Sequence, residues 1–340
     1  MTRWILIALS VTACAGEAEA PDPGRAAAQT DGPAPPPPES PATPGTAPRP
    51  GPTPVSVSRS CDPPRRTDRA PRLREGIVFA RPGGTPLALD LALPAGTGPH
   101  PVVLVIHGGG WSAGERTHVR DEIATLANAG WAGAALDYRL VEDGRNTSPA
   151  QVADARCAVR HLRRHATELG IDPDRIAALG YSAGGQIALM LATASDVPGL
   201  DQGCGDVSTS PRIAAAIAYF GPTDLRPEAE FSRAADRVVT RFLGTTRRRD
   251  PAAAALASPI THVDAGDAPV LLVHGTADRV VPYGQAVMMR EALERAGVPV
   301  TLVTIEDGQH GFRMFGDGAR VRPGTCTALA FLRAFVPAEV

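Results

Sequence analysis

The segment Arg175–Ala194, RIAALGYSAGGQIALMLATA, joins an apolar run, a turn that contains a serine, and an apolar helical pattern. Ser182 lies at the turn, with Gly180 two residues before it and Gly184 two residues after it. Where a strand turns sharply into a helix, side chains two positions before and after the turn residue would collide. The two glycines are therefore required by the turn, which lifts the Ser182 hydroxyl above the end of the strand.

The pentapeptide Gly180–Gly184, GYSAG, matches the G-x-S-x-G pattern, in which a serine is exposed between a strand and a helix. The helix that begins after Ser182 presents free backbone N–H groups, which favour developing negative charge. A serine hydroxyl is a weak nucleophile by itself and requires a base. Ser182 is therefore the candidate nucleophile, and a histidine and an acid should accompany it.

Apolar runs on both sides of this segment predict the fold class. They are continuous, as in strands buried on both faces, and they alternate with amphipathic stretches that predict helices. Examples are HPVVLVI, GWAGAAL, RIAAAIAYF, APVLLVHG and VPVTLVTI. Nearer the N-terminus, GIVFARPGGTPLALDLALPAG predicts two strands joined at Gly83-Gly84. We expect an α/β fold with a mostly parallel, twisted sheet of about eight strands, helices on both faces, and a short helical insert before the penultimate strand.

Functional groups of such sheets gather beyond the carboxyl ends of the strands. Among the eight histidines, His310 follows the last predicted strand, in the Gly-flanked loop DGQHGF. His107 and His274 lie at the ends of earlier strands, and His262 precedes the penultimate strand. The chain order that goes with a G-x-S-x-G turn is serine, acid, histidine. His310 is therefore the candidate base.

Two aspartates follow strands and could orient the imidazole of His310. Asp278 follows the strand APVLLVHG, and Asp224 follows the strand before it. Asp307 is too close to His310 in the sequence to reach round to its ring. We expect Asp278 to be the acid and keep Asp224 as the alternative.

The sequence HGGGW, His107–Trp111, ends another predicted strand. Because glycine has no side chain, the backbone N–H groups of this stretch are not obstructed. An acyl-transfer site needs such donors to bind the oxyanion of its tetrahedral intermediate. We expect the N–H groups of Gly109 and Gly110, together with that of Ala183 directly after the serine, to form an oxyanion hole.

The first 72 residues differ in composition from the rest. Residues 1–14, MTRWILIALSVTAC, join Arg3 to an apolar stretch too short to span a bilayer. They end in VTAC, which resembles a bacterial lipobox whose cysteine, here Cys14, is lipidated. Residues 15–72 are mostly Pro, Ala, Gly, Thr and Arg and predict a disordered tether. Residues 73–340 remain for one catalytic domain.

These features predict an extracytoplasmic lipoprotein of a bacterial cell envelope, held through Cys14 at the outer membrane or facing the periplasm, or else a secreted protein with an ordinary signal peptide. Outside the cytoplasm, the other four cysteines suggest two disulfides. Three pairings can be drawn, and we prefer Cys157–Cys204 with Cys61–Cys326. Buried free thiols are the alternative.

The charge distribution excludes some classes of ligand. The formal net charge is −2, and basic and acidic residues are interspersed, so no nucleic-acid-binding stripe is expected. His161 and His165 lie one helical turn apart, but the Glu of an HExxH motif is missing between them, and no Cys/His spacing indicates zinc. We expect no metal, and transfer of an acyl group through a serine needs no cofactor.

The motifs HGGGW, DYRL, GYSAGG, GPTDL, HGTAD and GQHGF follow the order and spacing of the α/β-hydrolase superfamily, which the chain resembles over about 76–336. It is most similar to the esterase/lipase-like branch with the bacterial feruloyl- and acetylxylan-esterase-like proteins. The hormone-sensitive-lipase-like esterases, which share HGGG, are neighbours, but the chain lacks their helical N-terminal cap. The resemblance implies the triad and the oxyanion hole named above.

We therefore expect a serine carboxylesterase that hydrolyses small or soluble esters, free or linked to a polysaccharide, through an acyl-enzyme on Ser182. The insert at about 226–267 is rich in Arg and has only Phe231 and Phe242 as aromatic residues. This composition predicts a short, charged roof that covers a fairly open site, and it does not favour a lipid tunnel. Two alternatives are a peptidase of the prolyl-oligopeptidase type, which usually carries a propeller, and an anchored, non-catalytic binding protein. The complete set of motifs argues against the second.

Overall fold

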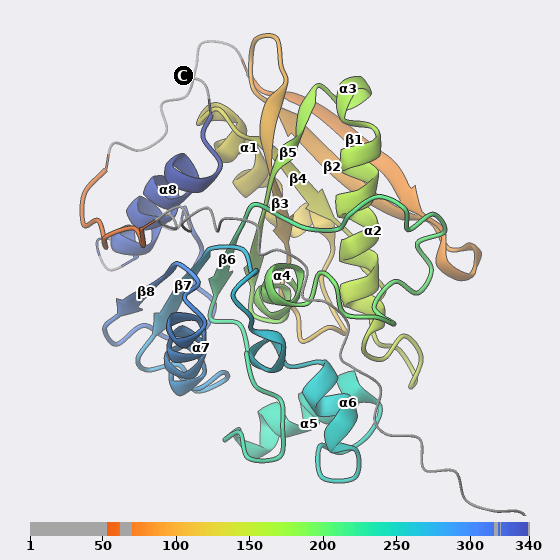
Figure 1. Ribbon diagram of the computed structural model, residues 1–340, viewed down its shortest axis with the longest axis vertical. Coiled ribbons are helices and arrows are strands. Elements are labelled where there is room, and N and C mark those ends of the chain that lie inside the picture. The colour runs from red at the N-terminus through yellow and green to blue at the C-terminus, as the bar shows by residue number, and fades with distance from the viewer. Residues whose placement is uncertain (1–52, 62–69, 316–318, 320, 339–340) are drawn as a thin grey trace, which may run out of the picture. The chain divides into compact units, whose positions relative to one another are not determined.

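The computed structural model describes residues 53–61, 70–315, 319 and 321–338, and these contain one eight-stranded sheet (Figure 1). The order across the sheet is β1-β2-β4-β3-β5-β6-β7-β8. The β1–β2 and β2–β4 pairs are antiparallel, and all other neighbours are parallel. The strands are β1 (Arg72–Ala80), β2 (Leu87–Leu93), β3 (His100–Ile106), β4 (Ala132–Leu136), β5 (Ile171–Tyr181), β6 (Ala215–Tyr219), β7 (Val270–Gly275) and β8 (Val300–Ile305).

Helices cover both faces of the sheet (Figure 1). Side chains of α2, α3, α4 and α7 pack on one face, and those of α1 and α8 pack on the other. The α-helices are α1 (Arg120–Asn128), α2 (Ala150–Arg164), α3 (Ala166–Leu169), α4 (Ala183–Thr193), α5 (Arg233–Leu243), α6 (Pro251–Leu256), α7 (Gly284–Arg295) and α8 (Arg322–Phe335). Short 3₁₀ helices are η1 (Pro82–Gly84), η2 (Arg116–Val119) and η3 (Pro259–His262).

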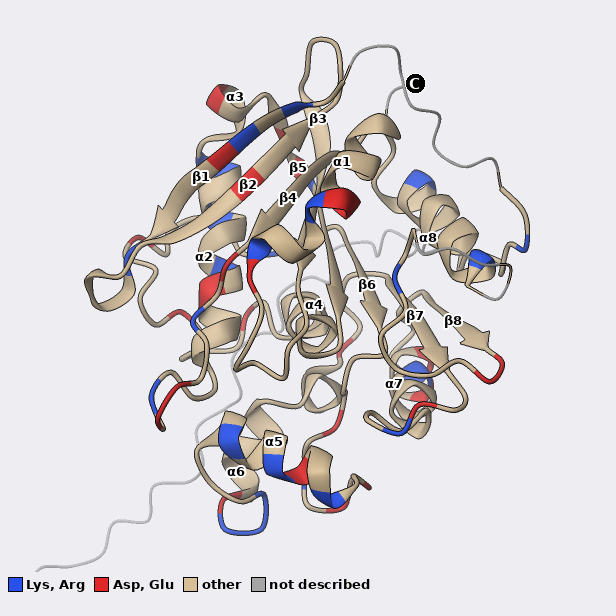
Figure 2. Cartoon of the chain, turned by 180° about the vertical axis from the view of Figure 1, so that it is seen from behind, with Lys and Arg blue, Asp and Glu red and all other residues tan. Residues whose placement is uncertain are grey.

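The continuous apolar runs fill both layers of the core. In β3, Leu104 and Ile106 belong to the cluster under α2 and α4, whereas Val103 and Val105 belong to the cluster under α1 and α8. Successive strand residues point to opposite faces, so a strand covered on both sides must be apolar at every position. Accordingly, β3, β4, β6 and β7 contain no Lys, Arg, Asp or Glu (Figure 2).

The strand order places the functional loops. The chain crosses from β3 to β4 on one side and then returns to β5 on the other, so that the sheet has a topological switch point between β3 and β5. Open α/β sheets bind ligands at such a point, beyond the carboxyl ends of the strands. The HGGGW loop follows β3, and Ser182 follows β5. The predicted fold class is confirmed, and α5, α6 and η3 form the expected insert between β6 and β7.

The predicted tether is too long at its C-terminal end. Residues 53–61 fall within the expected disordered segment 15–72, yet they lie against the folded domain. The Ser58 backbone N–H donates to the Thr327 hydroxyl (3.0 Å), and the Thr301 hydroxyl donates to the Val55 carbonyl (2.7 Å). The low apolar content did not reveal this segment, because hydrogen bonds to two threonine side chains and a disulfide hold it, and Val55 also packs against the core. Residues 1–52, with the lipobox and Cys14, lie outside the described residues.

Both disulfides join segments that are distant in the sequence, and they are the pairs that the sequence favoured. Cys61 is bonded to Cys326 in α8, which fastens segment 53–61 to that helix. Cys157 in α2 is bonded to Cys204 in the loop before β6. In the described part of the chain, no helix has the length and hydrophobicity required to cross a bilayer.

Candidate active site

The turn after β5 has the strained geometry that its sequence predicts. Ser182 has φ 53° and ψ −116°, and its backbone N–H donates to the Tyr219 carbonyl (2.9 Å). A Cβ atom on Gly180 would lie 1.9 Å from the Gly184 carbonyl oxygen. A Cβ atom on Gly184 would lie 2.2 Å from the Ile106 carbonyl oxygen. Both glycines are thus required because backbone passes where their side chains would be.

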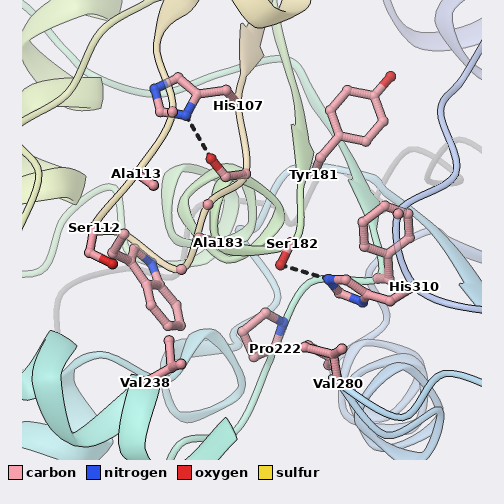
Figure 3. A pocket seen from close by; sticks show the side chains of 18 of the residues that line it. His107, Ser112, Ala113, Tyr181, Ser182, Ala183, Pro222, Val238, Val280 and His310 are labelled. Carbon is pink, nitrogen blue, oxygen red and sulfur yellow. Dashed lines mark hydrogen bonds between the residues drawn. The ribbon is translucent and has the colours of Figure 1, made fainter. Parts of the chain in front are cut away.

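The structure brings Ser182, His310 and Asp278 together from three loops. His310 Nε2 lies 3.0 Å from Ser182 Oγ (Figure 3), and His310 Nδ1 lies 2.7 Å from Asp278 Oδ2. Because a carboxylate only accepts hydrogen bonds, Nδ1 carries the proton and Nε2 is free to accept from the serine hydroxyl. This is the arrangement in which an imidazole can remove the serine proton.

Asp278 is buried, and both of its carboxylate oxygens accept hydrogen bonds. Its Oδ1 accepts from the backbone N–H groups of Val280 (2.8 Å) and Val281 (2.9 Å). His274 Nε2 donates to the Val281 carbonyl (2.9 Å) and lies 3.3 Å from Asp278 Oδ2. Burial raises the pKa of Asp278, but the hydrogen bonds from His274 and His310 outweigh it, so the net pKa is far below its usual range. Asp278 is thus an ionised carboxylate that accepts the hydrogen bond from His310 Nδ1 and orients the imidazole.

Asp224, the alternative acid, lies in a different environment. Its carboxylate accepts from Nε (3.0 Å) and Nη2 (2.7 Å) of Arg226. Burial raises the pKa of Asp224, and the hydrogen bonds and charge of Arg226 lower it further than burial raises it. The partner of Asp224 is therefore a guanidinium two residues away, and the carboxylate that contacts His310 is Asp278.

The glycine loop after β3 faces the same cavity as the serine. Gly109, with φ 122°, has no room for a side chain, because a Cβ atom would lie 2.0 Å from the Ala113 carbonyl oxygen. His107 Nδ1 lies 2.8 Å from the Gly108 carbonyl oxygen (Figure 3). In a trans peptide the C=O and the next N–H point in opposite directions. The Gly109 N–H therefore points away from His107.

A cavity of about 650 Å³ extends over Ser182 and His310 (Figure 3). All three expected oxyanion residues line it. Its other walls are mostly apolar and come from the glycine loop, from the insert and from the loops after β6, β7 and β8. Besides His310, the largest side chains that line the cavity belong to His107, Trp111, His118, Tyr181, Phe220, Phe231, Phe312 and Arg313.

The roof is less charged toward the cavity than its composition predicts. In α5, Ala235 and Val239 are buried and Val238 also lines the cavity, whereas Arg233 and Arg237 are exposed. An amphipathic helix presents its apolar stripe to the interior. The arginines of α5 therefore face solvent, and the cavity wall under them is hydrophobic.

Trp111 connects the glycine loop to the insert, a role that motif analysis did not reveal. Its ring stacks on Phe242 of α5, with ring centroids 4.0 Å apart. Its indole N–H donates to Gln186 Oε1 (3.1 Å), and Gln186 Nε2 donates to the Ala257 carbonyl (2.8 Å). The glycine loop, α4 and the insert are thereby held in one arrangement. The only sequence signal was an aromatic residue directly after the glycines.

The fold and this arrangement of serine, histidine and aspartate define the α/β-hydrolase class. Residues 89–293, more than half of the chain, match the sequence pattern of the BD-FAE family. The chain belongs to that family.

Related proteins agree with this class. The chain is 32% identical over 230 residues to the probable carboxylic ester hydrolase LipM of Mycobacterium tuberculosis, which covers 65% of this chain and 51% of LipM. Esterase LipQ of the same organism is 28% identical over 237 residues, which covers 68% of this chain and 55% of LipQ. The chain thus spans about half the length of these relatives.

A solved structure matches most of the chain. The apo form of esterase 2 of Thermogutta terrifontis is 30% identical, with a TM-score of 0.67, and the match covers 82% of this chain and 100% of that one. Esterase 2 has also been solved with propionate bound, with butyrate bound, and phosphonylated by sarin.

Proposed function

We propose that this protein is a serine carboxylesterase in which Ser182 is the nucleophile, His310 the general base and acid, and Asp278 the residue that orients and charges the imidazole. The observation that carries the proposal is the continuous chain of hydrogen bonds from Asp278 Oδ2 through His310 to Ser182 Oγ, at 2.7 and 3.0 Å. The serine hydroxyl at the end of these hydrogen bonds lies in a cavity large enough for a small ester.

The reaction follows from the positions of the protons. His310 Nε2 accepts the proton of Ser182 Oγ while that oxygen attacks the ester carbonyl carbon. The resulting oxyanion would accept hydrogen bonds from the backbone N–H groups of Gly109, Gly110 and Ala183, each such donor being worth about 10²–10³ in kcat. His310 then gives its proton to the alcohol oxygen as the carbonyl reforms, and an acyl-enzyme remains on Ser182. Attack of water on the acyl-enzyme, with His310 again as base, releases the acid.

Small or soluble acyl groups suit this site best. The apolar wall formed by Trp111, Phe231 and α5 favours alkyl or aryl acyl groups, but a cavity of about 650 Å³ must also hold the alcohol. Thermogutta terrifontis esterase 2, which binds propionate and butyrate, supports the same range. We infer hydrolysis of short-chain esters, free or attached to a polysaccharide.

The N-terminal sequence supports a place in the cell envelope. The apolar leader, the lipobox-like VTAC and the Pro-rich segment together suggest a protein lipidated at Cys14 and held on a bacterial membrane by its acyl chains. The two disulfides are consistent with a location outside the cytoplasm.

Substitution of the serine tests the catalytic proposal. Ser182→Ala should abolish hydrolysis of p-nitrophenyl butyrate and labelling by a fluorophosphonate, while the thermal unfolding temperature changes little. A matched control is Ser112→Ala, because Ser112 lines the same cavity, whereas the hydroxyl hydrogen-bonded to His310 is that of Ser182. Full labelling of Ser182→Ala would place the nucleophile elsewhere.

A further inference from the structure

Arg313 stands apart from the other residues around the catalytic cavity. Among the described residues that line it, Arg313 alone carries a permanent charge. Arg313 follows His310 by three residues in the loop after β8, and its side chain is 47% exposed. It is therefore accessible to a molecule bound next to His310.

A buried carboxylate holds this guanidinium in place. Arg313 Nη1 donates to Glu122 Oε1 at 2.6 Å, and Glu122 of α1 is only 3% exposed. In the described structure, Oε2 of Glu122 is buried without a hydrogen-bond partner, so Arg313 is its one cationic neighbour. Removing an ionised carboxylate from water is costly without a paired cation. The ion pair with the buried carboxylate of Glu122 therefore fixes the position of the Arg313 guanidinium.

The ion pair leaves donors available. A guanidinium has five N–H groups in a planar fork, and the contact with Glu122 uses one of them. The charge of Arg313 is balanced by Glu122, so these donors suit a neutral acceptor oxygen better than a second carboxylate. Guanidinium groups only donate, so a hydroxyl or ether oxygen of a ligand would act as the acceptor.

The position of Arg313 indicates which part of an ester it meets. His310 has to protonate the leaving alcohol, so the alcohol oxygen must lie within hydrogen-bond reach of His310 Nε2. Arg313 belongs to the same loop as His310, and Glu122 lies on α1. The residues of the insert that line the cavity, Phe231, Ala235, Val238 and Val239, are by contrast all apolar. The alcohol side is therefore the side that carries the guanidinium, and the acyl side is the one that faces the apolar residues of the insert.

We propose that Arg313, positioned by Glu122, is a specificity-determining residue that donates hydrogen bonds to a neutral oxygen of the leaving alcohol. The preferred substrates are then short acyl esters of hydroxylated or ether-containing alcohols. This inference rests on the proposed esterase activity and adds the alcohol preference to it.

Matched pairs of butyrate esters test it. Ethylene glycol monobutyrate is compared with propyl butyrate, and diethylene glycol monobutyrate with hexyl butyrate, so that each pair has the same chain length with and without oxygen. Butyryloxyacetate supplies a carboxylate on the alcohol. For each ester, kcat and KM are measured for wild type and Arg313→Ala, and the ratio of the two values of kcat/KM removes intrinsic differences in reactivity.

We expect Arg313→Ala to reduce kcat/KM for the glycol esters about 10- to 100-fold more than for their alkyl partners, mainly through KM. Glu122→Gln should reduce the glycol preference less, and it should raise kcat/KM for butyryloxyacetate because the guanidinium is then no longer neutralised. Arg237→Ala, which removes an exposed charge from α5, is the matched control and should leave all ratios near one.

Three results would overturn the inference. An equal loss on all esters, seen mainly in kcat, would mean that Arg313 only supports the His310 loop. A loss of kcat/KM confined to butyryloxyacetate would mean that Arg313 recognises an anion. If kcat/KM fell for none of the esters, Arg313 would have no part in recognising the alcohol. Absence of wild-type activity on every ester, including propyl butyrate, would instead contradict the esterase proposal itself. Thermal unfolding of each variant separates these results from misfolding.

Discussion

Replacing Asp278 with Asn should nearly abolish activity through the protonation of His310. The Oδ1 of Asp278 accepts two backbone N–H groups, those of Val280 and Val281. In the Asn variant, the amide oxygen would keep these two bonds, because turning the amide round would leave two buried donors unpaired at about 1–3 kcal/mol each. The amide NH₂ group would then face Nδ1 of His310.

An NH₂ group at this position forces Nδ1 to accept a hydrogen bond. The imidazole proton would move to Nε2, the atom that has to accept from Ser182 Oγ. The wrong tautomer of a catalytic histidine costs about 10⁴ in kcat, which corresponds to about 5.4 kcal/mol of transition-state stabilisation. We therefore expect kcat/KM of Asp278→Asn on p-nitrophenyl butyrate to fall about 10⁴-fold.

Asp224→Asn is the matched control, because it makes the same change in a buried carboxylate that follows the neighbouring strand. Its partner is Arg226 and not His310, so its activity should stay within about threefold of wild type. Both variants are assayed for hydrolysis, for the rate of fluorophosphonate labelling and for thermal unfolding. If Asp278→Asn keeps a tenth or more of the activity, or if Asp224→Asn loses more than Asp278→Asn does, the tautomer argument fails.

Two further predictions concern the substrate and the anchor. Across p-nitrophenyl esters from about two to sixteen carbons, kcat/KM should rise about 15-fold at most from acetate to butyrate, because two buried CH₂ groups contribute about 1.6 kcal/mol, and it should peak by about six carbons; a maximum at twelve or more would show that the cavity continues into a lipid channel. Cys14→Ser should move the protein expressed in a bacterial host from the detergent phase to the aqueous phase in a Triton X-114 partition, because the proposed attachment depends on acyl chains; a variant that partitions like wild type would refute the lipobox.

Much of the fold and of the site could be predicted from the sequence, because the causes lie within a few residues. Gly180 and Gly184 are required by backbone atoms of the turn and of the adjoining strand, so the G-x-S-x-G pattern indicated the position of Ser182 directly. The order of serine, acid and histidine along alternating strands and helices then indicated His310 and Asp278. Both disulfide pairs were also among the preferred assignments.

Other features depended on contacts between distant segments. Examples are the contact of His274 with Asp278, the stacking of Trp111 on Phe242 and the ion pair of Arg313 with Glu122, which arise only when the loops meet at one edge of the sheet. The sequence contains no local signal for them, since their partners are chosen by which side chains the folded sheet brings within reach.

For the N-terminal segment and the roof, too, the sequence determined some features and the tertiary structure determined others. Composition determined that residues 53–61 could not build a core of their own, but hydrogen bonds to Thr327 and Thr301 and the bond to Cys326 decided that they lie on the domain. Composition likewise showed that α5 is rich in arginine, but burial of Ala235 and Val239 decided which way those arginines face. The sequence by itself determined the periodicity and the strained turn, which depend on local sterics. Only the tertiary structure decided which face each element buries and which distant groups meet, because burial is a property of the packed chain.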